Sequence, residues 1–109
     1  MEGGVVQGIG WGLFEHMLYA PDGRMINPGL LDYRLPTALD VPKIESILVE
    51  EPTRNGPFGV KGVGEPPITP GLAVMANAIF DATGVRVKEV PVTPERLVMA
   101  LRQQGNGTP

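Results

Sequence analysis

Cysteine is absent from the 109 residues, and histidine occurs once, as His16. The absence of cysteine excludes disulfide bonds, thiolate metal sites, iron–sulfur ligation and a cysteine nucleophile within this chain. A single histidine excludes a zinc site that is built from several histidines. On its own, the chain therefore offers no metal-binding site of either type.

Positive charge is also scarce, because nine Lys and Arg residues stand against twelve Asp and Glu residues and give a net charge of −3. This balance argues against a nucleic-acid-binding surface. The longest weakly polar stretch, residues 5–14, is shorter than the roughly 20 residues that cross a bilayer. The first residues also lack the basic segment of a signal peptide. We therefore expect a cytoplasmic protein with neither a nucleic acid nor a membrane as partner.

Glycine and proline are abundant, with 15 and 12 residues respectively. They separate periodic apolar segments and form no biased run, which indicates a loop-rich globular chain. The length predicts one small domain, over residues 1–102. The end of the chain, residues 103–109, is predicted to be a flexible tail.

Residues 2–18 predict a helix, because apolar side chains recur there at helical intervals. These side chains are Val6, Ile9, Leu13 and Met17. Three glycines form a second stripe at every fourth position, namely Gly4, Gly8 and Gly12. Each interior glycine costs a helix about 1 kcal/mol relative to alanine. We therefore interpret the stripe as a surface that another backbone or a ligand approaches closely.

The central part of the chain has the pattern of extended segments. Pro21-Asp-Gly, between two short apolar runs, predicts a β-hairpin. Residues 43–51 alternate in polarity between prolines at 42 and 52. Residues 85–90 alternate in the same way. Both segments therefore predict β-strands.

Two further helices have clear start and end signals. Thr69 can cap the first, with Pro70 at its first position and Gly84 as a left-handed cap at its end. Thr93 and Pro94 open the second helix in the same way. The predicted order is helix, hairpin, strand, Gly/Pro loop, helix, strand, helix, which is an α+β fold.

Residues 53–67 contain four glycines and three prolines, and long irregular loops in small domains are often functional. Glu65 is the candidate general base of this loop. Pro66 pushes Glu65 toward extended geometry, and the Pro66–Pro67 pair stiffens the position. The preceding glycines allow a partner to approach the carboxylate. A solvated glutamate in a Gly/Pro-rich connection explains the same residues more simply.

Gln7 and Lys61 are further candidates for binding a ligand. Gln7 interrupts an apolar helix face and can both donate and accept hydrogen bonds, but an exposed polar helix residue explains it equally well. Lys61, four residues before Glu65, could tune that carboxylate or bind an anion, although an exposed lysine is the simpler interpretation. The loop has no phosphate-binding motif.

Several segments, in collinear order, resemble the end of the large subunit of the xanthine dehydrogenase and aldehyde oxidase family of molybdenum hydroxylases. The two strongest are Glu2-Gly-Gly-Val-Val-Gln7-Gly-Ile-Gly and Gly59-Val-Lys-Gly-Val-Gly-Glu65-Pro-Pro. Segments that begin at Asn27, Asn77 and Thr93 also match, so the resemblance extends over residues 2–102. It implies a partial domain of a larger molybdenum-cofactor-binding region.

The resemblance implies a role for each candidate residue. Glu65 would be the active-site base of an enzyme that oxidises N-heterocycles or aldehydes with oxygen derived from water. Gln7 would contact the molybdopterin cofactor, and the backbone from Lys61 through Val63 and Gly64 would line the same pocket. Molybdenum would accept the electrons, which iron–sulfur clusters and FAD on partner domains or subunits would carry away.

Large subunits of this family are several times longer than this chain. The resemblance therefore implies that the remainder of the molybdenum-binding subunit comes from a longer polypeptide or from a second one, and that the chain alone is inactive. The alternative is a free-standing, non-catalytic module that keeps the fold and acts through self-association or by binding a partner subunit. Such a homo-oligomer would bury the helix with Gly4, Gly8 and Gly12.

Overall fold

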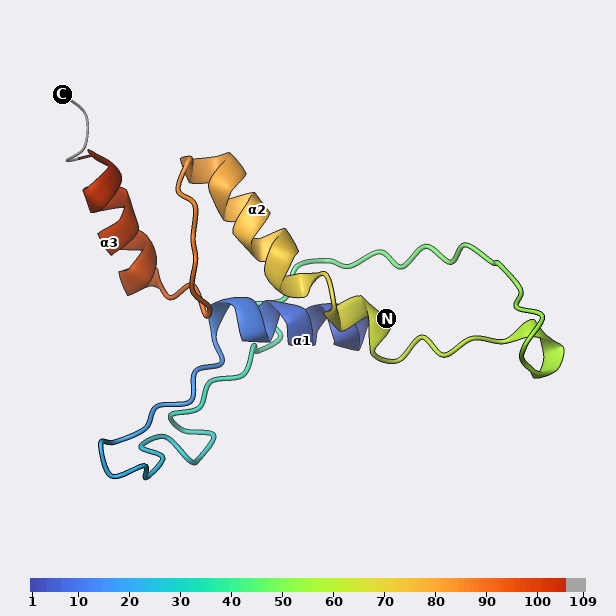
Figure 1. Ribbon diagram of the computed structural model, residues 1–109, viewed down its shortest axis with the longest axis horizontal. Helices are drawn as coiled ribbons and strands as arrows, with labels where there is room; N and C mark the ends of the chain where they lie inside the picture. Colours follow the sequence, from blue (N-terminus) through green and yellow to red (C-terminus); the bar gives the residue numbers. More distant parts are fainter. Residues whose placement is uncertain (106–109) are drawn as a thin grey trace.

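Helix α1 (Glu2–Leu13) lies at the centre of the molecule, and the other elements are arranged around it (Figure 1). The computed structural model describes residues 1–105. The remaining helices are α2 (Gly71–Thr83) and α3 (Pro94–Gly105), and two short 3₁₀ turns are η1 (Pro57–Gly59) and η2 (Pro66–Ile68). Helix α1 packs against α2 and η2, so the glycine-rich helix holds the loop with Glu65 in place.

The glycine stripe of α1 is the surface that α2 approaches. A Cβ atom on Gly8 would lie 2.9 Å from the Gly71 Cα, and a Cβ on Gly71 would lie 2.6 Å from the Gly8 Cα. A Cβ on Gly12 would lie 3.0 Å from the Met75 Cγ. The predicted close approach is therefore confirmed. All three glycines of the stripe are buried within this chain, so the stripe is not available as a surface for self-association.

The ends of α2 and α3 follow the sequence signals in part. Gly84 closes α2 in the left-handed conformation with φ of 72°, as predicted. The Arg96 N–H donates to the Thr93 Oγ at 3.3 Å, so Thr93 caps α3 as predicted. Thr69 does not cap α2, because the helix begins at Gly71 with Pro70 as the preceding residue, and no side chain caps this end.

The connection between α2 and α3 returns to the C-terminal end of α1. The Val92 N–H donates to the Gly12 carbonyl at 2.7 Å, and Val85 and Val92 are each 5% exposed. The guanidinium of Arg86 lies 3.8 Å from the centre of the Phe80 ring, which is a cation–π contact. These contacts hold the connection without forming a strand.

Helix α1 ends at Leu13, earlier than the stretch of residues 2–18 predicted. Asn27 directs the chain beyond this end. Its Nδ2 donates to the His16 carbonyl at 2.6 Å, and its Oδ1 accepts from the Leu18 N–H at 2.8 Å. Asn27 is 4% exposed, so its two bonds satisfy backbone groups that water reaches poorly.

Asn27→Ala is expected to lower the free energy of unfolding by about 1–3 kcal/mol, because it leaves a carbonyl and an amide without their partner. Urea unfolding followed by circular dichroism measures this change. Asn55→Ala is the matched control, since Asn55 is exposed and only its backbone is bonded. Equal stability of the two variants would contradict the bracing role of Asn27.

The predicted turn at residues 21–23 is present, but the hairpin around it is minimal. The Gly23 N–H donates to the Ala20 carbonyl, and the Ala20 N–H donates to the Arg24 carbonyl, both at 2.9 Å. One antiparallel bridge joins Tyr19 to Met25. No strand extends from this bridge in residues 1–105.

The strands predicted at 43–51 and 85–90 are likewise not confirmed, and neither is the α+β class, because the described residues form helices, turns and irregular segments. A strand needs a neighbour that supplies its ladder of hydrogen bonds. Within residues 1–105 neither segment has such a neighbour. Alternating polarity therefore identified segments with strand character, but not the presence of a partner.

The described chain is extended in shape. Its radius of gyration is 18.1 Å, whereas a compact domain of this length has about 13 Å. Among its apolar side chains, three are buried, Ile9, Val85 and Val92. Figure 1 shows one contribution to the extended shape: residues 43–64 run far out from the body of the molecule and back. Of the predicted tail, residues 103–105 continue α3, and residues 106–109 lie outside the described part.

Candidate active site

Glu65 lies at the start of η2, beside the first half of α1 (Figure 1). Its φ of −96° and ψ of −26° are helical, which corrects the extended geometry predicted from Pro66. The cause is local, because the Glu65 carbonyl accepts from the Ile68 N–H at 2.9 Å. This bond closes the turn and outweighs the usual preference of a residue before proline. The carboxylate therefore extends from a defined backbone position.

Gly4 sets the distance between this turn and α1. A Cβ atom on Gly4 would lie 2.9 Å from the Pro67 Cβ and 3.4 Å from the Gly64 carbonyl oxygen. The first distance is shorter than real Cβ contacts, so a larger residue would push the turn away. The absence of a side chain at Gly4 thus places Glu65 next to the α1 surface that carries Gln7.

The turn and the helix together form a hollow with a volume of about 510 Å³. Gly4, Gln7, Trp11, Gly64, Glu65, Ile68 and Thr69 line it. Gln7 and Glu65, which are far apart in the sequence, thus face the same space. Pockets of this size accommodate small molecules.

Two polar side chains of the hollow, Gln7 and Glu65, are free to engage a ligand. Gln7 and Glu65 are both exposed. Within residues 1–105, neither side chain forms a hydrogen bond or an ion pair. A carboxylate that accepts hydrogen bonds and an amide that donates and accepts them can together hold a polar group or take up a proton.

Trp11 also lines the hollow and was not among the site residues predicted from the sequence. It lies one helical turn after Gln7 and is 43% exposed. The spacing of four residues was the signal that could have placed it beside Gln7 on the same helix face. Its indole gives the hollow an apolar wall.

Lys61 and Val63 lie outside the Glu65 hollow, whereas Gly64 lines it. Lys61 and Val63 line a separate hollow of about 430 Å³, together with residues 49–52 and the tip of the loop. Glu50 and Glu51 share that space with Lys61. The structure therefore brings together three of the five predicted site residues, namely Gln7, Gly64 and Glu65.

The shifted pKa values occur away from the hollow. The Tyr33 hydroxyl donates to the Glu15 carboxylate at 2.6 Å, and this bond raises the pKa of Tyr33. The Thr37 hydroxyl and N–H donate to Asp40, and these bonds lower the pKa of Asp40. Both pairs fasten the 28–40 connection and take no part in the site.

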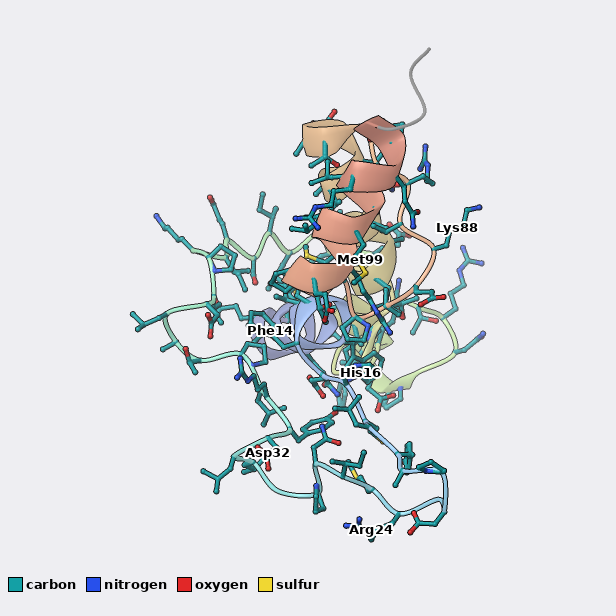
Figure 2. The ribbon with its side chains drawn as sticks, turned by 90° about the vertical axis from the view of Figure 1, so that its left-hand side faces the viewer. Phe14, His16, Arg24, Asp32, Lys88 and Met99 are labelled. Atoms are coloured by element: carbon teal, nitrogen blue, oxygen red, sulfur yellow. The ribbon has the colours of Figure 1, made fainter. Side chains whose placement is uncertain are left out.

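The single histidine, His16, lies at the junction after α1. Figure 2 shows it at the end of the helix, with Arg24 and Asp32 on the loop beyond, across α1 from α2 and α3. Within residues 1–105, no group of three or more His, Cys, Asp or Glu side chains could hold a metal ion. None of the described helices is both long and apolar enough to cross a membrane.

Comparisons with known proteins now give this geometry a context. The model of the molybdopterin cofactor-binding domain matches residues 1–42, which include Gln7. The xanthine dehydrogenase molybdenum-binding subunit of Escherichia coli O157:H7 is 47% identical over 98 residues, which are 89% of this chain and 13% of that relative. The aldehyde oxidoreductase of Megalodesulfovibrio gigas is 38% identical over 92% of this chain and 11% of its own length.

This chain is homologous to part of the molybdenum-binding subunits of the xanthine dehydrogenase and aldehyde oxidase family. The resemblance noted in the sequence is thereby confirmed. The solved structure of quinoline 2-oxidoreductase from Pseudomonas putida 86 has a TM-score of 0.81 and 35% identity over 94% of this chain. That match covers 13% of the quinoline enzyme. The chain thus spans a small share of each relative and corresponds to a partial domain.

Proposed function

We propose that this chain contributes one wall of the active site of a molybdenum-dependent hydroxylase that oxidises N-heterocycles or aldehydes. The supporting observation is that Gln7 and Glu65 line one hollow. The homologous subunits bind molybdenum according to their names. Gln7, Trp11 and Glu65 are exposed, so the remainder of the molybdenum-binding subunit would cover the hollow.

In this proposal, Glu65 is the general base. Its backbone is fixed by the η2 turn, and its carboxylate has no competing partner in the described residues. It would take the proton from the water-derived nucleophile that attacks an electron-poor carbon of the substrate. The molybdenum cofactor, when bound, supplies the redox chemistry by accepting two electrons from that carbon.

Gln7, Lys61, Val63 and Gly64 would bind the cofactor. The residues of the hollow fit such a group, since the Gln7 amide can donate and accept and Gly4 and Gly64 leave the backbone accessible. Lys61 and Val63 would contribute through their backbone, because their side chains line the neighbouring hollow. Iron–sulfur and FAD-containing subunits or domains would complete the path for electrons.

Gln7→Leu is expected to lower the molybdenum content of the assembly that contains this chain by about three- to tenfold, because one or two hydrogen bonds to the cofactor are lost. The measurement is metal analysis of the assembly, purified through a tag on this chain. Gln103→Leu, an exposed glutamine on α3, is the matched control. The chain purified alone is expected to retain no molybdenum and to show no hydroxylase activity.

Two results would contradict the proposal. One is a wild-type assembly without molybdenum. The other is a chain that purifies as a homo-oligomer and binds no longer polypeptide, which would favour the non-catalytic module instead.

A further inference from the structure

Residues 43–64 form an arm that leaves the body of the molecule and returns to η2, with η1 at its tip (Figure 1). At the tip, the Thr53 N–H donates to the Gly59 carbonyl at 3.1 Å. In the outgoing limb, residues 43–52, no backbone hydrogen bond joins the limb to another part of the described chain. A row of backbone donors and acceptors is thus left without protein partners.

The side chains of the outgoing limb are those of a strand that packs on both faces. In a strand, Ile47 and Val49 would project to one side and Leu48 to the other. Their exposed fractions are 73%, 88% and 73%. β-Branched residues in such an alternation are typical of paired strands, whereas a solvated loop of this size favours polar side chains. Prolines at 42 and 52 mark both ends of the segment.

The relatives are much longer than this chain, which leaves polypeptide available to cover the arm. The solved structure of CO dehydrogenase from Oligotropha carboxidovorans matches 98% of this chain with a TM-score of 0.84 and 28% identity. Because 98% of 109 residues leaves about two unmatched, the arm belongs to the shared backbone course. The match covers 14% of that protein. The same arm therefore exists in a protein that has much more polypeptide available to pack against it.

We infer that residues 43–51 pair as a β-strand with the edge of a sheet in the part of the molybdenum-binding subunit that lies outside these 109 residues. Such pairing supplies the missing backbone hydrogen bonds and buries the exposed apolar side chains. The inference rests on the proposed function, because it takes the partner to be the remainder of that subunit.

Phe58 at the tip gives a second, independent reason to expect a partner there. It is fully exposed, at 103%, and its φ of 55° is left-handed. A bulky residue rarely adopts this conformation, and it persists where the surroundings require it. The turn directs the Phe58 ring outward, which is the orientation of an aromatic residue that fills a pocket on a partner. The incoming limb then leads from Phe58 directly to Glu65, so docking of the arm would also fix the approach to the candidate base.

Amide hydrogen exchange tests the strand pairing in the assembly purified through a tag on this chain. Amides of residues 43–51 are expected to exchange about 100-fold or more slowly in the assembly than in the isolated chain, as in paired strands. The inference would be overturned if the amides of residues 43–51 exchanged as fast as those of a free peptide while the amides of α1 and α2 in the same assembly were protected. A chain that purifies without any longer polypeptide, or only as a dimer of itself, would overturn it as well.

A proline scan separates backbone pairing from mere side-chain contact. An edge strand directs alternate N–H groups to its neighbour, so proline is tolerated at every second position. Among Glu45→Pro, Ser46→Pro, Ile47→Pro and Leu48→Pro, two alternate variants should lose at least tenfold of the co-purified partner. The other two should retain it and serve as matched controls. Equal effects at all four positions would contradict edge pairing.

Phe58→Ala is expected to lower recovery of the partner by about tenfold, with the exposed Arg54→Ala as control. Equal recovery of the partner with both variants would remove the anchor role. All of these measurements read assembly, not turnover. An assembly in which Glu65→Gln keeps wild-type turnover would contradict the proposed function alone. A molybdenum-containing assembly whose amides at 43–51 are unprotected would contradict the strand pairing alone.

Discussion

Glu65→Gln is expected to lower turnover of the complete molybdenum-binding assembly by about 10²- to 10⁴-fold, which is the usual contribution of a general base. Glutamine has nearly the same shape as glutamate but cannot take up a proton in its place. Steady-state turnover with an N-heterocycle or an aldehyde measures the loss. Since the carboxylate has no hydrogen bond in the described residues, the variant should fold and retain its molybdenum.

The control for this prediction is Glu95→Gln, which removes an exposed carboxylate from the first turn of α3. It should leave turnover within about twofold of the wild type, because surface charges far from a site contribute little. Glu65→Asp adds a geometric test. It keeps the base but withdraws it by about one bond length, and a misplacement of about 1 Å can cost roughly a hundredfold. Wild-type turnover by Glu65→Gln would remove the assigned role.

The end of α2 and the start of α3 are the parts of the fold that the sequence predicts best. Gly84 and Thr93 act through bonds and angles that involve residues one to four positions away, so local sequence is sufficient to identify them. Glu65 shows the limit of such rules. Its geometry depends on competition between a following proline and a hydrogen bond that closes η2, and sequence does not show which one prevails.

The strand predictions were not confirmed, for a different reason. Alternating polarity describes the side chains of residues 43–51, but a strand is defined by its neighbour. If the neighbour lies on another part of the subunit, as we infer, the local pattern is correct while the described chain alone shows no sheet. The extended shape and the small number of buried apolar side chains have the same origin.

Local sequence patterns identified the candidate site one residue at a time, and only the family resemblance implied that these residues share a pocket. Glu65 and Gln7 were each identified by type and local context, and each had a simpler explanation. What joins them is the contact of α1 with η2 and α2, which depends on three-dimensional packing at Gly4 and Gly8. Trp11 enters the hollow through the same contact.

That packing contact is itself open to test by Gly8→Ala. The added Cβ would lie 2.9 Å from the Gly71 Cα and 3.4 Å from the Ile68 carbonyl oxygen. Both neighbours are backbone atoms, so no side chain can rotate away and the helices have to separate. Overpacking of this kind costs about 1–3 kcal/mol. We therefore expect a loss of that size in the free energy of unfolding, measured by urea denaturation.

Gly3→Ala is the matched control within the same helix, because nothing lies within 4 Å of the added Cβ. Both substitutions can gain up to about 1 kcal/mol of helix propensity, so the difference between the two variants isolates the contact with α2. Separation of α1 from η2 would also move Gln7 relative to Glu65. Gly8→Ala should therefore lower turnover of the assembly, while Gly3→Ala should not. Equal stability and equal turnover of the two variants would show that the glycine contact does not position the site.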